Sequence, residues 1–159
     1  MQNITLTILA GTGLGAAIAM SAGMAQEAPR PAGILKSQSQ LDAELERSTP
    51  ELGIVAGQVT EIIANDEGRI VVRRRLEGPN NASVHEDLTE VYQIVSGAGT
   101  FVTGGTIVSP EDRTAGLSGG VAQRVSEGDF IILPPGTPHW FSQIEGSITY
   151  VETRFATGR

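Results

Sequence analysis

Two histidines and one glutamate are the side chains of this sequence best suited to hold a metal ion. His85 is followed after four residues by Glu90, and His139 stands much later, within the stretch GDFIILPPGTPHW. Imidazole nitrogens together with a carboxylate suit a borderline divalent ion, namely Fe(II), Mn(II), Ni(II), Cu(II) or Zn(II). If neighbouring strands of a closed barrel carry these residues, their side chains meet at its mouth. We therefore predict a divalent metal site, with ordinary structural histidines as the alternative.

The turn that precedes His139 favours a ligand role for this histidine. Pro134 and Pro138 restrict φ, and Gly136 permits a positive φ, so the sequence Pro-Pro-Gly-Thr-Pro stiffens the chain before the next strand. A metal ligand needs such rigid support. We expect the turn to direct His139 toward the interior.

Two aromatic residues are aligned with the predicted ligands. Alternate residues of a strand share one face, so Tyr92 points the same way as Glu90, and Phe141 the same way as His139. Tyr92 is our candidate catalytic residue, as a proton donor near the metal. Phe141 is a candidate wall of the substrate pocket, and plain core packing is its alternative.

Three consecutive arginines stand in a strand that we predict over residues 69–76. Alternation places Arg74 on the face of Ile70 and Val72, and the other two arginines on the opposite face. An arginine directed into the barrel would clamp a substrate carboxylate through paired hydrogen bonds. Arg74 is therefore a candidate pocket residue, and a solvated strand edge is the alternative.

Short β-branched runs, separated by turn residues, predict that most of the chain after residue 53 forms strands. Asn65-Asp66-Glu67-Gly68 is a good hairpin turn, Gly97-Ala98-Gly99 is a second predicted turn, and residues 104–120 form a long loop with a short strand inside. The predicted strands of the domain are residues 54–64, 69–76, 82–85, 90–95, 100–103, 121–125, 130–133, 139–144 and 147–155.

The spacing of the predicted ligands closely resembles the two sequence motifs of the cupin superfamily. Ser83 stands where the first motif has its first histidine, and Gln143 stands where the second motif ends in asparagine. The motif segments cover residues 83–143, and the strand pattern extends the resemblance to about 53–155. The matching positions are His85, Glu90 and Gly97 in the first motif, and Gly128, Pro134, Gly136 and His139 in the second.

The resemblance implies an all-β fold, the cupin double-stranded β-helix or jelly-roll barrel. It implies that His85, Glu90 and His139 remain from a ligand set of three histidines and one glutamate. Ser83 and Gln143, at the two departing positions, join the candidate residues of the substrate pocket. Cupins of this size often pair through their sheets, so a homodimer is expected.

The function that the resemblance implies is a class rather than one reaction, because this fold hosts dioxygenases, isomerases, lyases, storage proteins and small-molecule binders. We expect a metal-dependent enzyme of the dioxygenase, isomerase or lyase type that acts on a small organic molecule. The alternative is a non-catalytic small-molecule-binding module with a degraded or structural metal site, and the departures at Ser83 and Gln143 favour it. A structural dimer without a ligand is a third possibility.

The composition excludes other functions. The formal net charge is −7 over 159 residues, which argues against nucleic acid as a partner because phosphates demand a basic surface. The chain contains no cysteine, so disulfides, thiolate zinc sites and a cysteine nucleophile are all excluded.

The N-terminus is typical of an export signal. Residues 1–25 contain no charged side chain, and Gly23-Met24-Ala25 provides the small residues that a signal peptidase requires. We predict a signal peptide over 1–25 and a periplasmic or secreted protein without stable membrane insertion after cleavage; an uncleaved anchor is the alternative. Residues 26–52 form a linker and a short helix over 37–47, and residues 53–159 form the cupin domain.

Overall fold

A computed structural model describes residues 33–48, 57–65 and 68–156 of the chain. Contacts between residues gather Leu35–Arg159 into one compact unit. The predicted signal peptide, residues 1–25, lies outside the described residues. No helix within the described ranges is both long and apolar enough to cross a bilayer.

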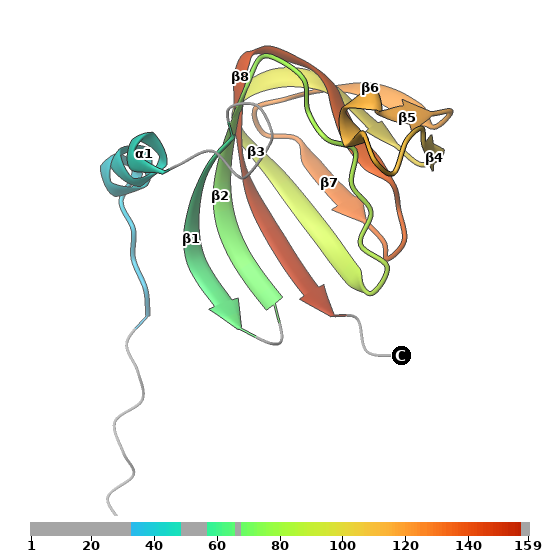
Figure 1. Cartoon of the computed structure of the whole chain (residues 1–159). Helices are drawn as coiled ribbons and strands as arrows, with labels where there is room; N and C mark the ends of the chain where they lie inside the picture. The colour runs from blue at the N-terminus through green and yellow to red at the C-terminus, as the bar shows by residue number, and fades with distance from the viewer. Residues whose placement is uncertain (1–32, 49–56, 66–67, 157–159) are drawn as a thin grey trace, which may run out of the picture. The chain divides into compact units, whose positions relative to one another are not determined.

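One antiparallel sheet contains nearly all of the described strands. Its order is β1-β2-β8-β3-β6, and β7 also pairs with β3. In Figure 1, β1, β2, β8, β3 and β7 lie side by side in this order. The mostly-strand architecture confirms the predicted all-β fold class. The strands are β1 (Gly57–Asn65), β2 (Gly68–Leu76), β3 (Leu88–Thr103), β6 (Val121–Ser126), β7 (Phe130–Leu133) and β8 (His139–Ala156).

Strands β3 and β8 are both longer than predicted because each continues through an expected break. They pair along their whole length, from Leu88 opposite Ala156 to Thr103 opposite His139, with register shifts at three places. Gly97 has a φ of 79°, and a Cβ at this position would collide with the backbone oxygen of Ser147. The glycine thus allows β3 to bend in close contact with β8, whereas we predicted a chain reversal there.

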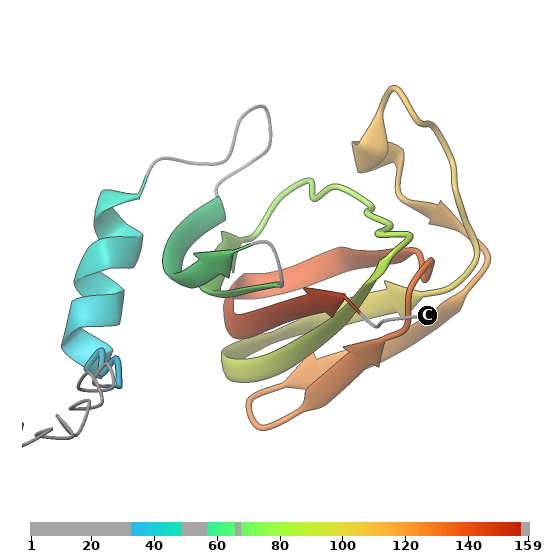
Figure 2. The same cartoon turned by 90° about the horizontal axis from the view of Figure 1, so that it is seen from below.

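The predicted short helix is confirmed as α1 (Gln38–Arg47). The Ser37 hydroxyl accepts a hydrogen bond from the backbone N–H of Gln40, whose side chain accepts one from the backbone N–H of Ser37. This reciprocal capping box satisfies backbone donors that the first turn leaves unpaired. Asp42 of α1 forms an ion pair of 2.7 Å with Arg74 of β2, and Leu45 is buried. The helix therefore packs on the outer face of the sheet (Figure 2).

The core of the barrel is rich in aromatic side chains. Tyr92 stacks on Tyr150 with ring centroids 4.9 Å apart, and Phe101 meets Phe141 edge-on at 4.6 Å. Such offset and edge-on contacts add to the stabilisation that burial of the rings provides. Buried aliphatic side chains complete this core: Ile94, Val125, Leu133, Ile144 and Ile148.

The long connection of residues 104–120 is fastened to the rest of the domain. Gly116 lies against the indole ring of Trp140, where a Cβ would overlap the ring. The carbonyl of Arg113 accepts a hydrogen bond of 2.9 Å from the N–H of Ala82. Its elements are β4 (Thr106–Ile107), the 3-10 helix η1 (Arg113–Ala115) and β5 (Leu117–Ser118), and β4 pairs with β5.

Candidate metal centre

The two histidines and Glu90 come together from separate parts of the fold. Glu90 is near the start of β3, His139 is the first residue of β8, and His85 lies in the segment between β2 and β3. The strand partner of His139 is Thr103, at the far end of β3 from Glu90. Glu90 and His139 nevertheless lie close together, because the bent β3–β8 pair folds back across the barrel.

Backbone hydrogen bonds set the position of His85. Ser83 and His139 form an isolated antiparallel bridge, in which each N–H donates to the carbonyl of the other at 2.9 Å. Two residues later, the carbonyl of His85 accepts a hydrogen bond of 2.9 Å from the N–H of Gly136. The proline–glycine turn that we expected to direct His139 thus holds His85 as well.

The ligand atoms of His85, Glu90 and His139 all lie within 4.8 Å of one another. The distance from His85 Nδ1 to Glu90 Oε1 is 2.6 Å, and that from His139 Nε2 to the same oxygen is 3.6 Å. The two imidazole rings stack with centroids 5.7 Å apart. Glu90 and His139 are buried and His85 is half-buried, so the cluster opens toward solvent on the His85 side.

The hydrogen bonds of His139 leave one of its nitrogens available to the cluster. Its Nδ1 lies 3.0 Å from the carbonyl oxygen of Thr137, which can only accept a hydrogen bond. A neutral His139 therefore carries its proton on Nδ1 and directs the Nε2 lone pair toward Glu90 and Tyr92. Burial lowers the pKa of His139 below its usual 6.5, which outweighs the opposing effect of Glu90 and keeps the ring neutral at pH 7.

Glu90 is ionised despite its burial. Burial alone would raise its pKa, but the hydrogen bond from His85 and the neighbouring His139 and Arg154 lower the pKa from 4.5 to about 2. Its Oε2 atom accepts hydrogen bonds from Tyr92 OH at 3.1 Å and from Arg154 Nε at 2.9 Å. Because an ionised carboxylate only accepts, His85 Nδ1 is the donor in the 2.6 Å contact with Oε1.

These three residues fit a divalent ion. Two imidazoles and one carboxylate form the minimal set for an ion that retains open positions for other ligands. The His85–Glu90 hydrogen bond is the contact that an ion would replace, since both atoms belong to the ligand set. The Oε2 contacts with Tyr92 and Arg154 hold the carboxylate orientation independently of that hydrogen bond.

A buried charge network extends from Glu90 into the barrel, and the sequence pattern did not single it out. Glu152 is 1% exposed, and its Oε2 accepts a hydrogen bond of 2.7 Å from Arg73 Nε. Arg154 Nε lies 2.8 Å from Glu152 Oε1 as well as close to Glu90, so it links the two carboxylates. Alternation places Glu152 on the same face as Tyr150. Charged residues in strands usually face solvent, so the sequence alone gives no reason to expect a buried charge network here.

A small, polar cavity of about 20 Å³ adjoins the cluster. The candidate pocket residues Ser83 and Phe141 line it, and the Tyr92 hydroxyl lies 3.2 Å from His139 Nε2. Several further lining residues were not predicted, among them Arg75, Asn80, Asn81 and Arg154. Asn80 and Asn81 lie in an irregular segment without strand pairing, so no periodic pattern marks their direction.

Arg74 does not lie in this cavity, which corrects the predicted pocket. It binds Asp42 of α1 and donates from Nε to Thr149 Oγ1 at 3.2 Å, on the outer face of the sheet. Its neighbour Arg75 faces the interior and lines the cavity. The alternation in this strand was predicted correctly, but Val72 is buried on the same face as Arg74, so buried apolar residues occur on both faces.

Gln143 also lies outside the cavity, and its side chain is exposed. The register between β3 and β8 shifts here, because Phe101 pairs with Phe141 whereas Thr100 pairs with Gln143. The extra residue, Ser142, is a β-bulge that reverses the alternation beyond it. Ile144 is therefore the next inward residue of β8, and the glutamine at the motif position points away.

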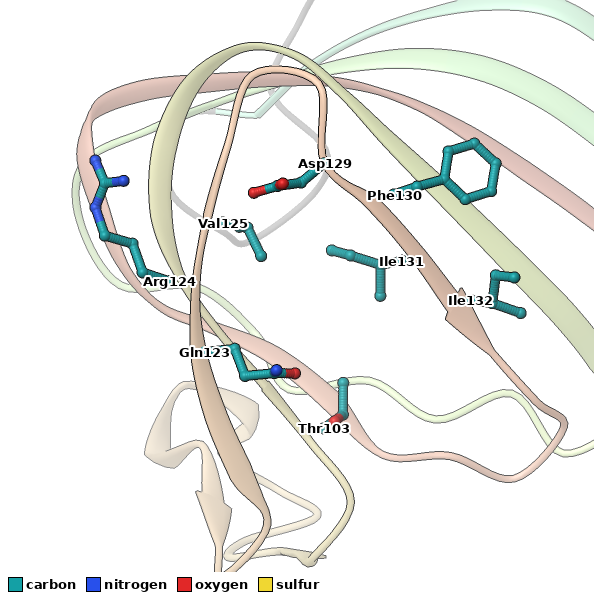
Figure 3. Close-up of a pocket in the computed structure, with 8 residues that line it drawn as sticks. All are labelled: Thr103, Gln123, Arg124, Val125, Asp129, Phe130, Ile131 and Ile132. Carbon is teal, nitrogen blue, oxygen red and sulfur yellow. The ribbon is translucent and has the colours of Figure 1, made fainter.

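A larger groove of about 380 Å³ lies between β6 and β7. In Figure 3, Val125 and Ile131 point toward one another across this groove, whereas Arg124 points away from it. Arg124 forms two hydrogen bonds of 2.9 Å with Glu145 instead. None of the three ligand residues lines the groove, so the smaller cavity is the candidate site. The groove is lined by Thr103, Gln123, Arg124, Val125, Asp129, Phe130, Ile131 and Ile132.

Comparisons with known proteins find similarity in structure only. No family model and no curated protein matches the sequence. An uncharacterised Klebsiella pneumoniae protein with a double-stranded β-helix domain is 14% identical, over 79% of this chain and 91% of that one, with a TM-score of 0.54. A predicted oxalate decarboxylase from Thermotoga maritima is also 14% identical, over 64% and 81%, with a TM-score of 0.50.

A third similar structure is the salicylate 1,2-dioxygenase of Pseudoaminobacter salicylatoxidans in its adducts with gentisate. It is 16% identical with a TM-score of 0.58, and the match covers 76% of this chain but 32% of the dioxygenase. At such identities the similarity establishes the fold rather than the activity. The fold that the two sequence motifs predicted is thereby confirmed: the chain adopts the cupin double-stranded β-helix.

Proposed function

We propose that this protein binds a divalent metal ion through His85, Glu90 and His139 and acts as a metal-dependent enzyme on a small organic molecule. The observation that carries the proposal is the meeting of these three side chains within 4.8 Å beside a polar cavity. A reaction of the dioxygenase, isomerase or lyase type suits such a site. Two proteins of similar structure are named for reactions of small organic acids, salicylate and oxalate.

In this proposal the ion supplies Lewis acidity that polarises a substrate oxygen or activates water or dioxygen. Glu90 would hold the ion through Oε1, since Arg154 and Tyr92 contact its other oxygen. The Tyr92 hydroxyl also lies 3.2 Å from His139 Nε2, so it is positioned between the ligand residues and the cavity. Burial raises the pKa of Tyr92 well above 10, so this hydroxyl is protonated at neutral pH and can donate a hydrogen bond.

A non-catalytic binding module is the second candidate, and one observation favours it. Glu90 is fully engaged by His85, Tyr92 and Arg154, so the carboxylate is satisfied without an ion. In this case the cavity binds a small molecule and the histidines serve as hydrogen-bonding groups.

Metal content separates the two candidates. The full chain, prepared without a histidine tag and reconstituted with Fe(II), Mn(II), Ni(II) or Zn(II), is expected to retain one ion per chain. His85→Ala and His139→Ala each remove a ligand and are expected to lose the ion. Arg74→Gln, on the outer face, serves as the matched control and should retain it. A wild-type protein that retains no ion would exclude the metal-dependent enzyme and leave the binding module.

We also propose that the chain forms a homodimer through the edge of its sheet. Strands β6 and β7 both lie at edges of the sheet, and Val121, Phe130 and Ile132 on them are 61%, 60% and 63% exposed. Exposed apolar side chains on an open strand edge favour pairing with another chain. Light scattering should give twice the chain mass for the wild type and a monomer for a Phe130→Ser, Ile132→Ser variant. A monomeric wild type would refute the proposal.

We propose, finally, that residues 1–25 are a cleaved signal peptide and that the mature protein is periplasmic or secreted. The uncharged, apolar composition of this segment supports the proposal. The mass of the protein recovered from the exported fraction is expected to match a chain that begins at Gln26. A full-length mass in the membrane fraction would instead identify an anchor.

A further inference from the structure

Arg75 is an interior arginine that has no opposite charge among the described residues. It faces the interior and lines the cavity beside the ligand cluster. Its Nε donates to the Tyr150 hydroxyl at 2.9 Å, and its Nη1 makes a long contact of 3.5 Å with Asn80 Oδ1. Both partners are neutral, and no carboxylate pairs with Arg75 among the residues that the structure describes. A guanidinium shielded from water in this way is stabilised by an anion.

The other arginine of the cavity differs from Arg75 in this respect. Arg154 lies within 2.9 Å of two carboxylates, Glu90 and Glu152. Its charge is therefore already balanced inside the protein. Arg75 is the cavity arginine with charge and hydrogen-bonding capacity to spare, because its Nη2 makes no hydrogen bond with any described residue.

The surroundings of Arg75 fit a carboxylate better than other small groups. The planar guanidinium fork matches the two oxygens of a carboxylate. Asn80, Asn81 and Ser83, which have uncharged polar side chains, line the same cavity. A volume of about 20 Å³ corresponds to roughly one water molecule, so the cavity accepts a small polar head group rather than a large ring system.

We propose that Arg75 binds the carboxylate of the substrate, and that the protein therefore takes a small organic acid. His139 and Tyr92 line the same cavity as Arg75, so an acid held there presents its neighbouring atoms to the ligand cluster. This inference rests on the proposed function of the same site. It adds the substrate class and a residue that determines specificity.

Matched pairs of acids and amides test this inference in the wild-type protein. Acetate and propionate are titrated into the full chain, and binding is followed by NMR; acetamide and propionamide are the uncharged controls of the same shape. The acids are expected to perturb the resonances of the cavity residues and to saturate, whereas the amides do not. Equal binding of acids and amides, or no binding of either acid, would overturn the inference.

Substitutions then assign the preference to Arg75. Arg75→Gln is expected to weaken acid binding roughly tenfold or more, because a charged hydrogen bond is lost. Arg74→Gln, the next residue on the same strand but on the outer face, should leave the affinity unchanged. If Arg75→Gln does not fold, Arg75→Lys replaces it: this variant keeps the charge without the fork, and wild-type affinity in it would overturn the inference.

Metal content measured on the same samples keeps the two proposals separate. If the protein retains an ion but does not prefer acids, the substrate class is wrong and the metal site stands. If acid binding depends on Arg75 but no ion is retained, the enzyme proposal fails, while the acid site stands as that of a binding module.

Discussion

At the scale of single residues, Glu90 is the group on which the site depends. It is buried, it is ionised, and it is contacted by His85, Tyr92 and Arg154. Each contact has its own role, since His85 belongs to the proposed ligand set, Tyr92 reaches toward the cavity, and Arg154 connects the carboxylate to Glu152. Loss of Arg154 therefore changes the charge balance of the interior as well as the site.

The ionised state of Glu90 makes the stability of the metal-free protein dependent on pH. The pKa of Glu90 is about 2 in the folded chain, below its ordinary value of 4.5. Its contribution is therefore fully present above about pH 4.5 and is lost as the pH falls through about 2. Denaturant unfolding at several pH values should show the difference between wild type and Glu90→Gln shrinking over this range. A difference that stays constant with pH would contradict the assigned ionisation.

Arg154 is expected to stabilise the fold much more than an exposed arginine does. Its substitution by Gln leaves Glu90 and Glu152 short of a buried counter-charge, which costs about 3 kcal/mol in the free energy of unfolding. Arg124→Gln is the matched control, because it breaks an exposed ion pair with Glu145 and should leave the free energy of unfolding nearly unchanged. Urea unfolding measures both values, and equal losses would show that the interior network is unimportant.

At the scale of elements, one turn positions both histidines. The turn before β8 binds the His85 carbonyl through Gly136 N–H and accepts the His139 ring N–H on the Thr137 carbonyl. Gly136 has a φ of 73°, which side chains other than glycine adopt at a cost. The glycine of the second motif thus has a physical role in aiming the ligands.

Two matched glycine substitutions test this role. Gly136 and Gly146 share a φ of 73°, but a Cβ on Gly136 would lie 3.2 Å from Glu86 Oε2, whereas one on Gly146 meets nothing within 4 Å. Each change to Ala is expected to cost about 1 kcal/mol of stability because of the positive φ. Metal affinity, measured by titration, should fall only for Gly136→Ala. Equal metal affinity in both variants would show that the turn does not position the ligands.

The sequence predicted the strands better than it predicted how they bend. Hydrophobic alternation and turn residues located β2, β6 and β7 closely, and the motif spacing selected the residues that meet. The pattern could not reveal that Gly97 bends β3 where a turn was expected, because a glycine is compatible with both. It also could not reveal the bulge at Ser142, which moved Gln143 out of the pocket.

At the scale of the whole domain, the arrangement of α1 and the sheet decides which arginine serves the site. Residues 73–75 alternate between faces, but sequence alone does not show which face the helix covers. Asp42 of α1 takes Arg74, and Arg75 is left to the interior. Local sequence patterns do not encode such contacts between distant segments. For this reason Arg75, rather than the predicted Arg74, lines the cavity.

The barrel interior combines an aromatic core with a charged end. Tyr92 belongs to both, since it stacks on Tyr150 and donates to Glu90. The residues of the proposed metal site, the cavity and the internal ion pairs all lie close together. The central claim is the position of the ion, because the acid site and the role of Tyr92 are defined relative to it.

Anomalous diffraction from crystals soaked in Mn(II) tests that claim most directly. We expect one strong anomalous peak per chain, in contact with His85, Glu90 Oε1 and His139 Nε2, whose ligand atoms lie within 4.8 Å of one another. The peak should vanish in crystals of His139→Ala. Absence of a peak at these residues in fully soaked wild-type crystals, or a peak elsewhere in the chain alone, would contradict the account.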